Sequence, residues 1–318
     1  MSELQILAAP PLQLPLLVRS ELLAAGMTER QIRWRLRTGQ WVQLRAGIYV
    51  EAAVLAALPA DSIRRHALDV EAARRRLRDD TVASHESAAR LLGMKLLSPP
   101  LGVRVTRASD QERQPQRYRG LLVRVSQLPP EHLHPTLIDG IPLTGAARTA
   151  IDLGRTATLR QSVVTADSAL ALGRMTPEEL AAALDWAKQW PGTQQAEAMV
   201  MLADGRRESP FESESFVGFY ECGLELPEPQ VVIGDGSGQT ARVDNLWREH
   251  HTVGEADGLG KYVDRADKLA ERERQLWIES LGLEVVRWAP EEIHPRRMRG
   301  LCRKIEAAFV RAHRRWGD

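Results

Sequence analysis

Two short segments near residue 250 restrict the fold of this chain more than any other feature. Residues 242–247 (RVDNLW) and 252–256 (TVGEA) are β-prone and only four residues apart, which predicts an antiparallel hairpin. Directly paired positions then have numbers that add to a constant, so Asp244 faces Glu255, with Cβ atoms roughly 4.5–5.5 Å apart. Asp257 lies two residues beyond Glu255 and therefore projects from the same face.

Three carboxylates on one face need a compensating positive charge. Like charges in direct opposition destabilise a hairpin, and oxygen ligands of this kind suit Mg²⁺ or Mn²⁺. The hypothesis is a metal site formed by Asp244, Glu255 and Asp257, because such a cation acidifies a bound water and stabilises charge on a phosphate. Glu212 could add a further carboxylate, and Lys261 could orient the water or stabilise the same charge. The alternative is that the acids are edge charges that discourage strand pairing.

The segments around this hairpin predict an αβββαβ core followed by a basic helix. Pro210 begins a helix that ends near Cys222, and alternating or β-branched runs mark the strands. The further elements expected are strands at 231–233, 242–247, 252–256 and 284–288 and helices at 265–281 and 296–315.

The N-terminal segment has the signals of two short helices followed by a hairpin. Ser20 predicts the cap of a first helix that ends at Ala25, and Thr28 with Gln31 forms the pattern of a capping box. The elements expected are helices at 20–25 and 29–38 and strands at 41–44 and 48–50, with a turn at Ala46–Gly47. This order predicts a winged helix-turn-helix.

The second of these helices carries a set of arginines. Ile32 and Leu36 lie four residues apart and mark its buried side, so the arginines point mostly outward. Binding in the major groove of DNA requires such a face, because cations neutralise phosphates and long side chains reach base edges. The alternative is a protein-interaction module whose arginines are only solvated. The candidate DNA-binding residues, including one in the hairpin, are Arg30, Arg33, Arg35, Arg37 and Arg45.

The middle of the chain looks like scaffold. Helices are expected at 62–77, from 146 onward and after Thr176, and strands at 103–106 and 122–125. His85 and Ser87 could suggest a base and a nucleophile, but neighbouring residues on a helix point apart, and capping and packing explain them better. His132 and His134, in a Pro-rich turn, are expected to be solvated.

Length and composition bound the architecture. A chain of 318 residues exceeds one ordinary core. We expect an α+β or α/β multidomain protein with segments 1–52, 53–205 and 206–318. No stretch approaches the ~20 apolar residues of a membrane span, and the start lacks the features of a signal peptide. A soluble, cytoplasmic protein is therefore expected, and its oligomeric state stays open.

The two cysteines, Cys222 and Cys302, have no ligand spacing, so neither a disulfide framework nor a zinc site is expected. Both are predicted to be buried free thiols.

The N-terminal part resembles the actinobacterial AbiEi-type antitoxin family. The resemblance rests on AGMTERQIRWRLRTGQWVQLRAGIYV at 25–50, SHESAARLLG at 84–93 and GIPLTGAARTAIDL at 140–153. It implies a winged helix followed by a mixed α/β middle domain, a role in phage defence or a toxin–antitoxin context, and a cognate toxin as a possible partner.

The C-terminal part resembles the Vsr-like branch of the PD-(D/E)XK nuclease superfamily, which has the restriction-endonuclease fold. SPFES, RVDNLW, GEADG with Lys261, and LGLEVVRW carry this resemblance. Asp244 matches the first acid and Glu255 the second. The lysine position holds Asp257 instead, so Lys261 or Lys268 would have to serve. The implied function is a Mg²⁺- or Mn²⁺-dependent endonuclease acting on DNA. The alternative is an antitoxin-like transcriptional autoregulator with an inactive nuclease fold.

Overall fold

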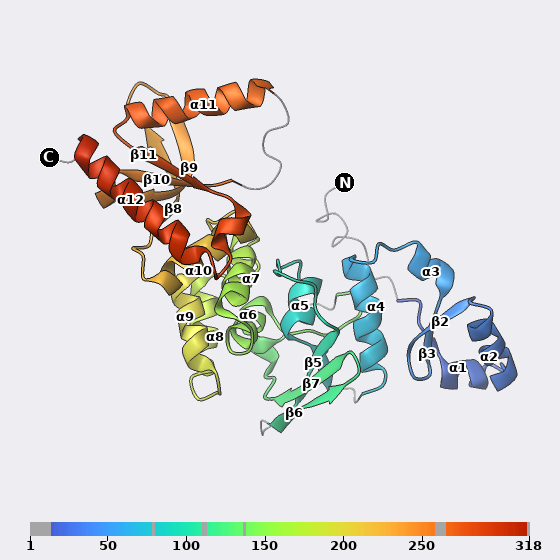
Figure 1. Ribbon diagram of the computed structural model, residues 1–318. Coiled ribbons are helices and arrows are strands. Elements are labelled where there is room, and N and C mark those ends of the chain that lie inside the picture. Colours follow the sequence, from blue (N-terminus) through green and yellow to red (C-terminus); the bar gives the residue numbers. More distant parts are fainter. Residues whose placement is uncertain (1–13, 78–79, 110–112, 136–137, 258–264, 317–318) are drawn as a thin grey trace. The chain divides into compact units, whose positions relative to one another are not determined.

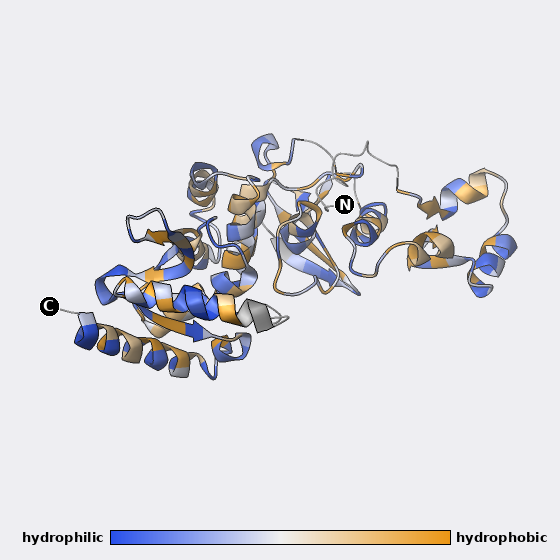
Figure 2. Ribbon diagram, turned by 90° about the horizontal axis from the view of Figure 1, so that it is seen from above, coloured by the Kyte–Doolittle hydropathy of each residue, from blue (hydrophilic) through white to orange (hydrophobic). Residues whose placement is uncertain are grey.

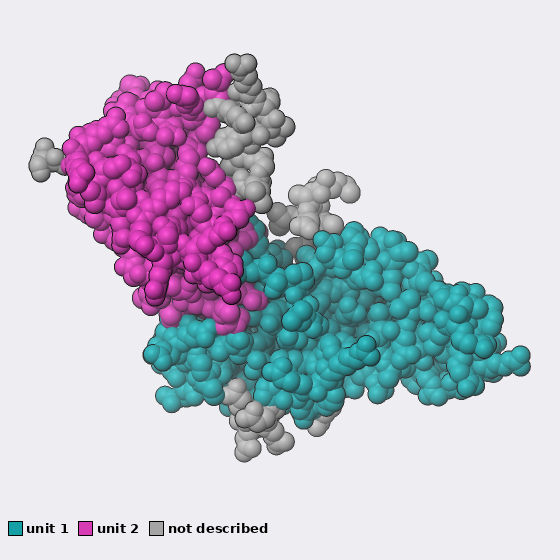
Figure 3. Space-filling model, in the orientation of Figure 1, with its two compact units in different colours: residues 1–156, 174–197 teal, residues 157–173, 198–318 magenta. Residues whose placement is uncertain are grey.

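The chain divides into two compact units. The structure is a computed structural model and describes residues 14–77, 80–109, 113–135, 138–257 and 265–316. Unit 1 comprises residues 1–156 and 174–197, and unit 2 comprises residues 157–173 and 198–318 (Figure 3). This division differs from the three consecutive segments expected from the sequence, because residues 157–173 of the middle segment belong to the same unit as the C-terminal part.

Unit 1 begins with the expected order of two helices and a hairpin (Figure 1). Helices α1 (Arg19–Ala24) and α2 (Glu29–Arg37) precede strands β2 (Trp41–Arg45) and β3 (Ile48–Glu51), and a short strand β1 (Leu17–Val18) adds to the sheet in the order β1-β3-β2. The core of this part includes Ile32, Trp41 and Tyr49.

Helix α2 starts at the capping box that the sequence predicts. The Thr28 hydroxyl accepts the N–H of Gln31, and the Gln31 side chain accepts the N–H of Thr28. The expected cap at Ser20 is wrong, because α1 begins one residue earlier and its N-cap is Val18, which makes no side-chain cap bond.

The rest of unit 1 packs helices against a four-stranded mixed sheet. Strands lie in the order β4-β5-β7-β6, with β5 parallel to β7. Thr176 caps α8 in a second capping box. The elements are α3 (Ala52–Ala56), α4 (Ile63–Arg74), β4 (Thr81–Ala83), α5 (His85–Leu91), β5 (Val103–Ala108), β6 (Arg113–Tyr118), β7 (Leu121–Ser126), α6 (Ala146–Gly154) and α8 (Pro177–Trp186).

Three histidines of unit 1, His66, His85 and His132, contact other side chains of the unit. Ser87 is fully buried, and its hydroxyl contacts His66 Nε2 at 2.9 Å and accepts the N–H of Arg104, so it is unavailable as a nucleophile. Burial lowers the pKa of His66 to about 4 and that of His85 to about 3. His132, expected to be solvated, is half-buried, and its ring lies 4.0 Å from that of Trp186 between centroids.

These two lowered pKa values predict that acid destabilises unit 1. Between pH 6.5 and the pKa of each histidine, the unfolded chain binds more protons than the folded chain, so stability is full above pH 6.5 and falls as the pH decreases. Each histidine should contribute about 1.4 kcal/mol per pH unit. Urea unfolding followed by circular dichroism from pH 7.5 to 5 measures this slope. His66→Gln should reduce it. An unchanged slope in His66→Gln would contradict the prediction.

Unit 2 contains the helices and strands expected for the C-terminal part. The expected bounds 210–222, 252–256 and 284–288 coincide with those of α10, β10 and β11. The expected residues 231–233 and 242–247 fall inside longer strands. The elements are α7 (Leu159–Ala171), α10 (Pro210–Cys222), β8 (Glu228–Gly234), β9 (Thr240–Trp247), β10 (Thr252–Ala256), α11 (Arg265–Ser280), β11 (Glu284–Trp288) and α12 (Met298–Trp316), while α9 (Thr193–Leu202) leads into the unit.

The unit 2 sheet has the strand order β11-β10-β9-β8. Strands β8, β9 and β10 are antiparallel neighbours, and β11 returns through α11 to lie parallel to β10. Helices α10 and α12 cover one face, where Trp247 and Trp288 are buried with Ile305. In Figure 2 hydrophobic and hydrophilic residues alternate along the C-terminal helix, as expected for a helix with one buried side. Helix α11 covers the other face, with Ile278 packed near Val253.

Gly254 fixes which way the side chains of β10 point. A Cβ atom on Gly254 would lie 2.7 Å from Trp247 and 2.8 Å from Trp288, so this position has no room for a side chain. Because side chains alternate along a strand, Glu255 projects from the opposite face, toward α11.

Among the residues that the structure describes, no helix is both long and apolar enough to cross a membrane. Of the two cysteines, Cys302 is buried as expected and Cys222 is exposed.

Candidate active site

The register of the hairpin is the one expected from the sequence. Thr252 pairs with Trp247, Val253 with Leu246 and Gly254 with Asn245, so the next positions are Glu255 and Asp244. Asp244 Oδ2 also accepts the backbone N–H of Ala256 at 2.9 Å. The two carboxylates therefore come from adjacent strands and the same face of the sheet.

The three predicted acids line one pocket of about 540 Å³ on the α11 face of the sheet. Asp244, Glu255 and Asp257 share this pocket with Gln230 and with arginines from β9, α11 and β11. The Glu255 side chain is 7% exposed. Burial, together with the negative charge of Asp244, raises the pKa of Glu255 to about 7, against the opposing effect of Arg274. The pocket thus holds two carboxylates that are costly to ionise together without a cation.

Two arginines that the sequence analysis missed partly neutralise these acids. Arg274 of α11 donates to Glu255 Oε1 at 2.9 Å and to the carbonyl of Arg242 at 2.9 Å. Arg287 of β11 lies 3.4 Å from Asp257 Oδ1. Glu271 pairs with both arginines. Arg287 pairs with Glu255 in the register of the parallel strands β10 and β11. Its place at the site could be predicted only by someone who already knew that these two strands are neighbours.

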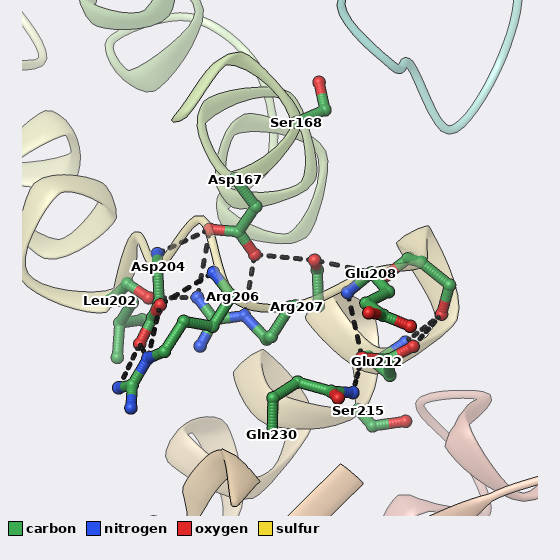
Figure 4. Close-up of polar contacts among 12 residues, drawn as sticks. Asp167, Ser168, Leu202, Asp204, Arg206, Arg207, Glu208, Glu212, Ser215 and Gln230 are labelled. Atoms are coloured by element: carbon green, nitrogen blue, oxygen red, sulfur yellow. Dashed lines mark hydrogen bonds and ion pairs between the residues drawn. The ribbon is translucent and has the colours of Figure 1, made fainter. Parts of the chain in front are cut away.

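Glu212 joins the site through a neighbouring glutamine. Glu212 lies in the first turn of α10, and its Oε2 accepts from Gln230 Nε2 at 2.9 Å. The same Gln230 amide donates to Asp244 Oδ1 at 3.3 Å. Figure 4 shows Gln230 beside Glu212, with the Ser209 end of α10 held by further polar contacts. Glu212 was expected at this site from the sequence, whereas Gln230, which belongs to no local motif, was not.

Asp244 and Glu255 offer carboxylate oxygens, the kind of ligand that Mg²⁺ or Mn²⁺ prefers. Within the described ranges, no group of three or more His, Cys, Asp or Glu residues is close enough to hold a metal ion. A pair of carboxylates suffices for Mg²⁺, which usually keeps several waters and takes one or two carboxylates. Lys261, the proposed charge-stabilising residue, lies outside the described residues. Lys268, its alternative, belongs to α11.

The arginines expected to bind DNA fall into two groups. Arg30, Arg33 and Arg37 are exposed on α2, and the described part of the chain offers them no hydrogen-bonding or ion-pair partner. Their spacing places them on one side of the helix. Trp34, which the sequence analysis did not single out, is 46% exposed on the same side. These four residues form what we call the α2 basic face.

The other two arginines are already engaged. Arg35 donates to Gln40 at 2.8 Å and lies over the Trp41 ring. Arg45 donates to the carbonyls of Arg119 and Gly120, each at 2.8 Å. Both therefore hold the unit 1 fold together in this structure and are less available to a nucleic acid.

Comparisons with known proteins find relatives of part of the chain. No family model matches. Over 149 residues, 47% of the chain, it is 29% identical to proteins named Uncharacterized protein MT2308 and Uncharacterized protein Rv2248, from two strains of Mycobacterium tuberculosis. The chain spans about half the length (55%) of these curated relatives. The crystal structure of the Rv2827c protein from Mycobacterium tuberculosis superposes with a TM-score of 0.41 at 17% identity, covering 58% of this chain and 71% of that chain.

Proposed function

We propose that this protein is a divalent-metal-dependent endonuclease of the Vsr-like PD-(D/E)XK type, acting on DNA that its N-terminal winged helix binds. The observation that carries the proposal is the pairing of Asp244 with the buried Glu255 on adjacent strands of the αβββαβ unit, inside a polar pocket. A pair of facing carboxylates at this position suits a hard cation and a phosphodiester substrate.

Asp244 and Glu255 are the residues that would hold Mg²⁺ or Mn²⁺. When bound, the ion would lower the pKa of a water molecule and stabilise negative charge on the phosphate. Asp257 stays in the pocket as an accessory acid paired with Arg287. Gln230 donates hydrogen bonds to both Glu212 and Asp244.

Arg274 and Arg287 supply fixed positive charge in the same pocket. Guanidinium groups bind phosphate oxygens strongly, often through two parallel hydrogen bonds, and charge placed in advance stabilises a transition state without reorganisation. Arg274 lies 2.9 Å from Glu255. It can therefore take the role that the superfamily pattern gives to a lysine, beside Lys261 or Lys268.

The α2 basic face is the proposed DNA-binding surface. Exposed, unengaged arginines neutralise phosphates, and an aromatic side chain among them can contact bases or sugars. Positioning by unit 1 and cleavage by unit 2 would then be separate tasks of one chain, in phage defence or a toxin–antitoxin setting.

The test of the proposal is metal-dependent nicking of supercoiled plasmid by the full chain. We expect nicked circles with Mn²⁺ or Mg²⁺, none with EDTA, and recovery when excess Mn²⁺ is added back. Calorimetric titration of Mn²⁺ on the same preparation checks the site independently. Absence of both binding and nicking in the wild type would refute the nuclease.

A second candidate function is an antitoxin-like transcriptional autoregulator with an inactive nuclease fold and a toxin partner. The observation that favours it is that Glu255 and Asp257 already have arginine partners within the protein, which would compete with a metal ion. A protected promoter sequence in a footprint, without cleavage in Mn²⁺, would select this function over the nuclease.

A further inference from the structure

Gln230 has a backbone conformation that strand residues other than glycine rarely adopt. Its φ is +54° in the middle of β8. Pro229 pairs with Asn245 and Val231 with Val243, so Gln230 lies opposite Asp244 on the neighbouring strand β9. A non-glycine residue in the left-handed region is strained and persists only when its surroundings hold it there.

The side chain of Gln230 bridges two carboxylates. Its Nε2 donates to Glu212 Oε2 at 2.9 Å and to Asp244 Oδ1 at 3.3 Å. An amide nitrogen carries two hydrogens, so both are used. Since Asp244 Oδ2 accepts from Ala256 N–H, the two oxygens of Asp244 are oriented from two different strands.

The Glu212 end of this bridge is itself fixed. Glu212 is 9% exposed, and its carboxylate accepts from the Ser209 hydroxyl at 2.7 Å and from the N–H of Glu208 at 3.0 Å. A buried ion pair holds the segment before α10, because Arg207 donates to Asp167 of α7 at 2.7 and 3.0 Å. Figure 4 shows this network running from Asp167 to Gln230. The bridge thus rests on a rigid base.

We propose that Gln230 is a positioning residue for the metal site, whose strained backbone is retained because it aims the amide at Asp244. This inference rests on the proposed function, since it assigns a residue to the same pocket. This role differs from a purely structural one in one respect: removing the amide should weaken metal binding even where removing the strain stabilises the fold.

Gln230→Gly tests this by removing both the amide and the strain. The thermal stability of the full chain should stay level or rise, because glycine accepts a positive φ, while Mn²⁺ affinity measured by calorimetry should fall about tenfold, as for other outer-shell partners of metal ligands. Gln230→Met keeps the length and the strain but has no donor, and it should show a similar loss of affinity.

His251→Gly is the matched control. His251 has φ +45° at the turn between β9 and β10, so glycine relieves comparable strain there, and Mn²⁺ affinity should stay at the wild-type value. Wild-type binding that Gln230→Gly and Gln230→Met both leave intact would overturn the positioning role alone. A loss in Gln230→Gly that Gln230→Met does not share would also overturn it. No binding by the wild type would overturn the nuclease proposal itself.

Discussion

Replacing Asp244 with asparagine should lower plasmid nicking by on the order of a thousandfold and Mn²⁺ affinity by about a hundredfold or more. The change removes the charge of one of two proposed ligands but keeps the shape and the acceptor for Ala256 N–H. Charge stabilisation by a catalytic metal amounts to several kcal/mol, and each 1.36 kcal/mol corresponds to about tenfold in rate. Nicking rates under single-turnover conditions and calorimetric titration measure the two effects.

The matched control for this variant is Asp235→Asn. Asp235 is exposed beyond the end of β8 and bonds to Ser237, so the same chemical change there should leave both binding and nicking intact. Full activity in Asp244→Asn would remove the mechanism, and equal losses in both variants would point to a general effect on the domain.

The triple variant Arg30→Ala/Arg33→Ala/Arg37→Ala should weaken DNA binding on the order of a hundredfold at 0.1 M salt. Each phosphate contact contributes about 0.9 to the slope of log K against log salt, so three lost contacts should make the slope shallower by about 2.7. Fluorescence anisotropy with a short duplex at several salt concentrations gives both quantities. A salt slope equal to that of the wild type would exclude the α2 basic face as the binding surface.

Arg35→Ala/Arg45→Ala provides the contrast for the triple variant. These two arginines bond to Gln40 and to the carbonyls of Arg119 and Gly120. We expect their loss to lower the midpoint of thermal unfolding while changing the salt slope little. The reverse pattern would mean that these arginines, when DNA is present, leave their intramolecular partners.

Local signals account for the parts of the fold that the sequence predicts correctly. The capping boxes at Thr28 and Thr176 involve residues three positions apart, so both are legible in the sequence. The register of β9 and β10 follows from a short turn, and this is why the facing of Asp244 and Glu255 could be inferred before the structure was known.

The missed residues reach the site through tertiary structure. Arg287 lies beside Glu255 only because β11 runs parallel to β10. Arg274 belongs to α11, the helix that connects these two strands in the chain. Gln230 contacts Asp244 from a backbone conformation with a positive φ, and the neighbouring residues in the sequence do not predict this conformation. Spacing along the chain therefore identified the acids and could not identify the groups that neutralise and orient them.

Unit 2 is discontinuous in the sequence, because it consists of residues 157–173 and residues 198–318. A fragment starting near residue 206 would lack Asp167 and leave Arg207 without its buried partner, a loss of about 3–5 kcal/mol for a broken buried pair. Neither recombination nor cloning can therefore transfer the candidate nuclease unit as one contiguous segment. Gene transfer would have to carry both parts of unit 2 together with the segment of unit 1 that lies between them. We therefore expect the two units to be inherited together.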